Sequence, residues 1–167
     1  MGPEDLQDLA QEFLDACVEA LDTIPVSAPG LGGAPERSYI THALPAFDCC
    51  PQLTVHVASV TPSPTSPGTA IGTSARSALV TVVGLVATIL RCVQAGENIP
   101  TATMTAEAAQ INADGWALWN EILNAIRAGT LFQQCGEVFW DGLRPSPAQG
   151  GCAGWTLNLR VLLDGYP

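Results

Sequence analysis

Six cysteines are the most reactive side chains of this chain, and they stand at positions 17, 49, 50, 92, 135 and 152. A zinc site is not expected, because the sequence has no C-x-x-C pair and Cys49 and Cys50 are its only adjacent cysteines. A catalytic thiol needs a nearby base. His56 follows Cys49 by seven residues, which separates the two by more than about 20 Å in an extended chain. We therefore expect no metal site and no local cysteine–histidine catalytic pair.

Disulfide bonds are another use for these cysteines. The two adjacent cysteines have Cα atoms about 3.8 Å apart, which is too close for an unstrained bridge. Each would need a distant partner, for which Cys17 and Cys92 are candidates. Cys135 and Cys152 form a second candidate pair that would close the loop before the last predicted strand, a constraint worth about 3 kcal/mol. The alternative is that all six are buried thiols acting as small hydrophobic side chains.

Histidine and glycine spacing indicates no further chemistry. His42 and His56 fall in predicted strands, where a structural role is the simpler interpretation. Gly30, Gly32 and Gly33 are typical of a turn, because no Lys-Ser or Lys-Thr follows them and no helix begins there. The sequence therefore predicts no catalytic residue, no cofactor site and no enzymatic activity.

Charge excludes a further class of function. Sixteen acids against six cations give a net charge of −10, and all six cations are arginine. A nucleic-acid reader needs a basic stripe, which these scattered arginines do not form. The acidic first ten residues do not match a secretory signal. The longest apolar uncharged run, residues 78–90, is shorter than the roughly 20 residues of a membrane span. We expect synthesis in the cytoplasm and no membrane partner.

The first element that positions these residues is a helix over about residues 4–24. Its apolar positions recur at spacings of three and four, which predicts one buried stripe. The apolar positions are Leu6, Leu9, Ala10, Phe13, Leu14, Cys17, Leu21 and Ile24. The other faces carry seven of the sixteen acids and no cation.

The remaining pattern predicts strands and a second helix. The strands are expected at residues 37–44, 53–60, 76–93 and 155–163, the helix at 105–128, and a flexible loop at 61–75. The helix is expected to bury Ala108, Ile111, Gly115, Leu118, Trp119, Ile122 and Ile126. The chain has enough apolar residues, 47% of 167, for one core. We therefore predict a single α+β domain over residues 1–167, with an antiparallel sheet of about four strands packed against two helices.

Aromatic residues lie among aliphatic ones in the C-terminal half, at Trp116, Trp119, Phe132, Phe139, Trp140 and Trp155. A base-stacking platform would come with cations, which are missing around them. We interpret these residues as core or subunit contacts.

Four segments together resemble the tail terminator proteins of long-tailed bacteriophages, particularly those that infect high-GC hosts. The segments are LDACVEALDTIP, GGAPERSYITHALPAFDCCPQLTVHV, DGWALWNEILNAIRAG and GGCAGWTLNLRVLLDGY. The resemblance extends over nearly the whole chain and rests on the order of elements, not on a catalytic motif.

This resemblance implies a structural virion protein at the head–tail junction. Such a subunit forms a six-membered ring on the finished tail tube, ends addition of the major tail tube protein and joins the head completion or connector protein. Genome DNA passes through its lumen without specific binding. The alternatives are another neck component, such as a head–tail connector or tail completion adaptor, and, in a different class, a small thiol-dependent enzyme using Cys49 or Cys50.

A closed ring needs two different surfaces on each subunit. One set of candidates comprises the ends of the long predicted strand and the predicted loop, with Arg76, Arg91, Pro64, Pro67 and Ile71. The sheet edge and the aromatic residues of the second helix are further candidates.

The acidic face of the first helix is a separate candidate. Asp8, Glu12, Asp15 and Glu19 could dock on a basic surface of the tube or connector, or they could simply be a solvated face. Six chains would carry −60, from six times −10, and a negative lumen would repel the phosphates of passing DNA. We expect no cluster of arginines along that lumen.

Overall fold

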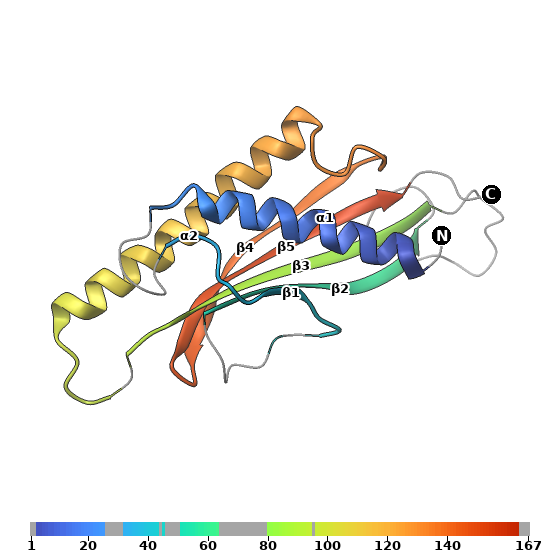
Figure 1. Ribbon diagram of the computed structural model, residues 1–167. Coiled ribbons are helices and arrows are strands. Elements are labelled where there is room, and N and C mark those ends of the chain that lie inside the picture. The colour runs from blue at the N-terminus through green and yellow to red at the C-terminus, as the bar shows by residue number, and fades with distance from the viewer. Residues whose placement is uncertain are drawn as a thin grey trace.

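A five-stranded sheet carries the two described helices on one of its faces (Figure 1). The computed structural model describes residues 3–25, 32–43, 45, 51–63, 80–94 and 96–163. The elements follow one another as α1 (Pro3–Asp22), β1 (Ser38–Ile40), β2 (Gln52–Ser63), β3 (Val80–Cys92), α2 (Thr101–Ala128), β4 (Val138–Gln149) and β5 (Cys152–Leu163). The α+β class predicted from the sequence is therefore confirmed.

The sheet has the strand order β1-β2-β3-β5-β4. Strands β2, β3, β5 and β4 pair antiparallel, whereas β1 runs parallel to β2 over three residues. An antiparallel sheet of about four strands was expected, and four strands do pair in this way, but β1 does not. The sheet is mixed, and β4 is a strand that the sequence pattern did not predict.

The sequence does not predict β4, because a glycine and a proline interrupt the alternating pattern that is typical of a strand. Gly142 lies at a register shift against β5 and has a φ of 119°. Pro145 pairs with Trp155 inside the same strand. Proline is tolerated there because β4 is at the edge of the sheet, where one side of the backbone needs no ladder partner.

Several predicted bounds also change. The strand expected at 37–44 contracts to β1, and the strand expected at 53–60 extends to Ser63. Residues 61–63 are therefore strand instead of loop, and the rest of the predicted loop, 64–75, lies outside the described residues. Helix α2 begins four residues earlier than predicted, at Thr101, and ends at Ala128. Gly129 caps it in the left-handed conformation that glycine adopts readily.

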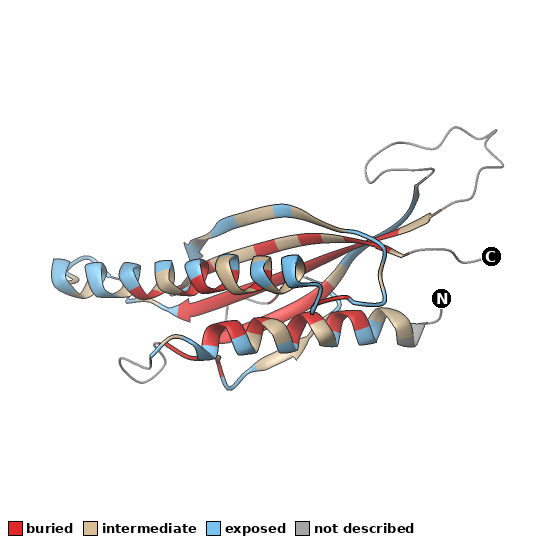
Figure 2. Cartoon of the chain, turned by 90° about the horizontal axis from the view of Figure 1, so that it is seen from above, coloured by how far each residue is buried: buried red, intermediate tan, exposed pale blue. Residues whose placement is uncertain are grey.

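The core lies between the two helices and one face of the sheet. Phe13 and Leu21 of α1, Leu85 of β3, Leu118 of α2 and Leu157 of β5 are fully buried in it. Figure 2 shows the buried residues gathered where the helices meet the strands. The predicted apolar stripe of α1 is thus the face that packs on the sheet.

Close packing between α2 and β5 depends on one glycine. A Cβ atom on Gly115 would lie 2.6 Å from the ring of Trp155. The indole Nε1 of Trp155 donates a hydrogen bond of 2.7 Å to the carbonyl oxygen of Ile111. Because glycine has no side chain, the indole can lie against the helix backbone.

Candidate functional site

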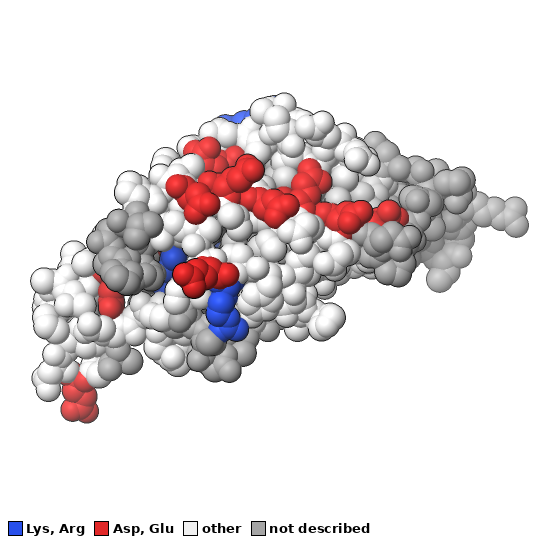
Figure 3. All heavy atoms as spheres, in the orientation of Figure 1, with Lys and Arg blue, Asp and Glu red and all other residues white. Residues whose placement is uncertain are grey.

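Acidic side chains run along the outward face of α1 (Figure 3). Asp8, Asp15 and Glu19 are exposed there, as predicted for a solvated or docking face. We call these three residues the acidic ridge. Glu12 differs from them, because its Oε1 accepts a hydrogen bond of 2.5 Å from the backbone N–H of Phe132. Glu12 therefore holds the α2–β4 connection against α1.

Part of the acidic ridge works against the stability of its own helix. Asp15 and Glu19 lie four residues apart, a spacing at which like charges repel on a helix. Glu19 also lies near the C-terminal, negative end of the helix dipole. The last turn of α1 has no basic residue that would offset this charge. Glu19 therefore lowers the stability of the C-terminal end of α1.

Arg91 is not available to any partner, contrary to its interpretation as an interface residue. Its side chain and that of Asp114 are each 1% exposed. Arg91 Nε lies 2.8 Å from Asp114 Oδ2, and Nη2 lies 2.9 Å from Asp114 Oδ1. Nη2 also donates to the carbonyl oxygen of Gly33 at 2.6 Å. The guanidinium joins β3, α2 and the turn before β1 inside the protein.

The other predicted interface residues of this group cannot be placed. Arg76, Pro64, Pro67 and Ile71 lie outside the described residues.

Two exposed tryptophans lie on α2. Trp116 is 69% exposed and Trp119 is 38% exposed. Trp119 packs edge-on against Trp140 of β4, with ring centroids 4.9 Å apart. We call Trp116, Trp119 and Trp140 the aromatic patch. The expectation that Trp119 is buried is wrong, because its ring lies over the outer edge strand instead of inside the core.

The N-terminal part of α2 is also less buried than predicted. Ala108 is exposed. In Figure 1 the first turns of α2 extend past the sheet, so this part of the helix has no strand beneath it. Of the residues predicted to be buried, Gly115, Leu118 and Ile122 are buried.

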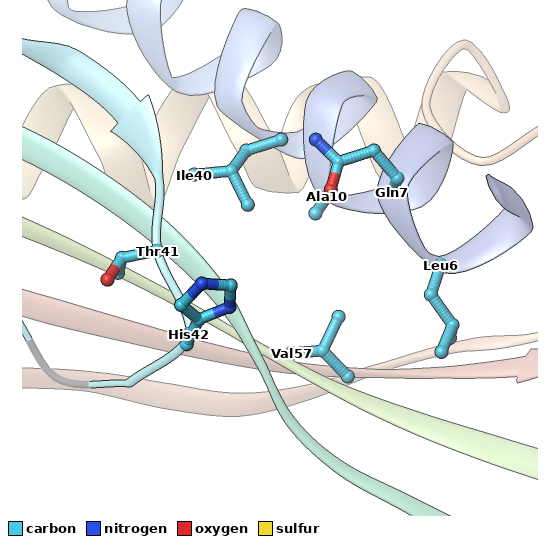
Figure 4. Close-up of a pocket in the computed structure, with 7 residues that line it drawn as sticks. All are labelled: Leu6, Gln7, Ala10, Ile40, Thr41, His42 and Val57. Atoms are coloured by element: carbon cyan, nitrogen blue, oxygen red, sulfur yellow. The ribbon is translucent and has the colours of Figure 1, made fainter. Parts of the chain in front are cut away.

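A small cavity lies between α1 and the β1–β2 edge (Figure 4). Its volume is about 280 Å³, and its lining comprises Leu6, Gln7, Ala10, Ile40, Thr41, His42 and Val57. Thr41 and His42 are consecutive and project in different directions (Figure 4), so the imidazole does not activate the neighbouring hydroxyl. This lining contains no nucleophile paired with a base.

The described cysteines occupy separate places. Cys17 is fully buried in the core, and burial raises the pKa of its thiol. Cys135 precedes Gly136, whose N–H bonds to Leu162 at the end of β5, whereas Cys152 begins β5. Ten residues of extended strand span about 33 Å, far beyond the reach of a disulfide. The separation therefore excludes the candidate Cys135–Cys152 bridge.

The remaining candidates for chemistry that the structure describes do not come together. Within the described ranges, no group of three metal-ligating side chains comes together. Cys49 and Cys50 lie outside the described residues. His56 is buried in β2, and burial lowers its pKa. His42 is exposed beside the small cavity.

Comparison with known proteins finds no family model that matches the chain and no curated protein that matches it. Neither helix, as far as it is described, is long and apolar enough to cross a membrane. The surfaces of the molecule are therefore the remaining guide to function.

Proposed function

We propose that the protein is a structural subunit that assembles into a ring and acts as a tail terminator at the head–tail junction of a long-tailed bacteriophage. The role of the ring as a tail terminator is taken from the sequence resemblance. Self-assembly is supported by the sheet, because its two edges differ in sequence and geometry. Heterologous contacts between unlike surfaces are what generate a closed ring.

One edge of the sheet is only partly covered. Strand β1 pairs with Leu53, Thr54 and Val55 of β2. Beyond that point the described residues provide no outer partner for β2, and Val60 on this stretch is 47% exposed. An unpaired strand edge is a ready template for a strand of another chain.

The opposite edge is β4, which pairs only with β5 among the described strands. The N-terminal part of β4, from Val138 to Trp140, contains no proline, so each of its residues has a backbone N–H group. Trp119 of α2 packs against Trp140 on this edge strand. A β2 edge from one subunit and a β4 edge from the next would give two unlike surfaces that meet.

Charge is consistent with a passage for DNA. Arg91 is buried, and Arg160 is bonded to Asp141. The exposed arginines in the described part of the chain, Arg37, Arg127 and Arg144, lie on three separate segments. The net charge of −10 per chain would repel the phosphates of passing DNA.

Native mass spectrometry and electron micrographs of the purified protein test the ring. We expect a closed ring, with six subunits as the count implied by the resemblance. Val60→Lys should reduce ring formation, because a lysine on a strand edge opposes edge pairing. Val60→Thr is the matched control and should keep the ring. A wild-type protein that remains monomeric at high concentration would refute the proposal.

A tube-growth assay separates a terminator from the nearest alternative, another neck component. Adding the protein to polymerising major tail tube protein should shorten the tubes in proportion to the dose. A connector or completion adaptor would leave tube length unchanged. Unchanged tube length with intact rings would therefore assign the protein to the neck without the terminator role.

A further inference from the structure

Two cysteines face each other across the ladder between β3 and β5. The register pairs Cys92 with Cys152. The next residues along are hydrogen-bonded, because Val93 N–H donates to the carbonyl oxygen of Gly151 at 2.8 Å. In an antiparallel ladder the two kinds of pair alternate, so Cys92 and Cys152 form a non-hydrogen-bonded pair, whose Cα atoms are about 4.5 Å apart.

The two side chains also project from the same face of the sheet. Four residues along the same register, Thr88 and Thr156 form another pair, and their hydroxyl oxygens are 3.4 Å apart. Because strand side chains alternate with a period of two, Cys92 and Cys152 share that face. A disulfide needs Cα atoms roughly 4.4–6.8 Å apart, and this pair meets that requirement without a change of register.

We propose that Cys92 and Cys152 are a redox site that closes into a cross-strand disulfide. Cys92 is exposed and Cys152 is buried, so an oxidant in solution reaches Cys92 first. Both side chains are thiols in the structure. The inference is independent of the proposed ring function.

The reaction with hydrogen peroxide balances in two steps. The Cys92 thiolate attacks one peroxide oxygen and breaks the O–O bond, which gives a sulfenic acid and, after protonation of the leaving hydroxide, one water. The Cys152 sulfur then attacks the Cys92 sulfur and displaces the hydroxyl group, which leaves as a second water with the thiol proton. The two thiols lose two electrons in total, and the peroxide gains them.

The bond would join the end of β3 to the start of β5 and so enclose α2 and β4 in one covalent loop. Closing a loop of about 60 residues restricts the unfolded chain strongly. A protein made in a reducing compartment would acquire this bond only on transfer to an oxidising one. The pair thus links the stability of the fold to its redox environment.

Peroxide treatment followed by thiol alkylation and peptide mapping without reductant tests the site. We expect loss of two hydrogens from the intact mass, a linked peptide containing Cys92 and Cys152, and a thermal midpoint raised by about 10 °C. Dithiothreitol should reverse all three effects. The variants Cys92→Ser and Cys152→Ala should each abolish the link and the rise, whereas the control Cys135→Ser should keep both.

Other outcomes overturn the proposal. One is further oxidation of Cys92 to the sulfinic acid with Cys152 still alkylatable. Another is a linked peptide that joins Cys92 to any other cysteine. The unfolding transition of each reduced variant shows whether it is folded, so loss of the link cannot be mistaken for loss of structure.

Discussion

The buried ion pair between Arg91 and Asp114 provides the sharpest test of how the protein is held together. Asp114→Asn keeps the size of the side chain and removes its charge. Arg91, 1% exposed, would then remain charged beside a neutral amide and the carbonyl of Gly33. Breaking one side of such a pair costs about 3–5 kcal/mol, because the remaining charge stays desolvated.

Urea and thermal unfolding, followed by circular dichroism, measure this loss. We expect a fall in the thermal midpoint of about 6–20 °C for a chain of this size. The matched control is Asp141→Asn, which breaks the exposed bidentate pair with Arg160, whose side chains are 31% and 34% exposed. That substitution should cost less than about 1 kcal/mol.

A double-mutant cycle isolates the cause. Replacing both partners, Arg91→Met with Asp114→Leu, should cost much less than the sum of the two single changes. Each single change leaves one buried charge without its partner, whereas the double change leaves none. If Asp114→Asn costs no more than Asp141→Asn, or if the double change is additive, the ion pair does not act as described.

Three further predictions concern single positions. Burial lowers the pKa of His56, so the unfolded chain binds a proton on this imidazole more readily than the folded chain does. The free energy of unfolding should therefore fall as the pH drops below about 6.5. The urea midpoint should fall less over the same pH range in His56→Asn. Gly115→Ala should destabilise by about 1–3 kcal/mol, because the added Cβ meets Trp155; a gain in the urea midpoint, as ordinary helix propensity would give, contradicts this. Glu19→Lys should stabilise by about 0.5–1 kcal/mol at low salt; an unchanged low-salt midpoint would show that the ridge carries no strain.

Much of the fold was predictable because local patterns dictate it. The stripe of apolar residues on α1 defines that helix, and the alternation along β5 matches its buried and half-buried positions. Gly129 marks the end of α2 through its left-handed conformation. These signals involve residues close together in the sequence.

The missed features depend on residues far apart in the sequence. Arg91 ends an apolar run, so its charge suggested an exposed strand end. Its partner Asp114 lies 23 residues further on, and no sequence pattern indicates that the two meet. Proline in β4 disfavours a strand in the local sequence, and only the pairing with β5 shows that one forms. The pairing of Cys92 with Cys152 is likewise visible only once the β3–β5 register is known.

The acidic ridge has a consequence for the ionic strength at which the protein is most stable. Helix α1 has 20 residues, so it is about 30 Å long. At about 0.01 M salt the Debye length is also about 30 Å, and every acid on the helix repels every other. At about 1 M it falls to about 3 Å, and the repulsion is screened. The fold should therefore become more stable as salt is added, and concentrated brine should preserve it better than dilute buffer.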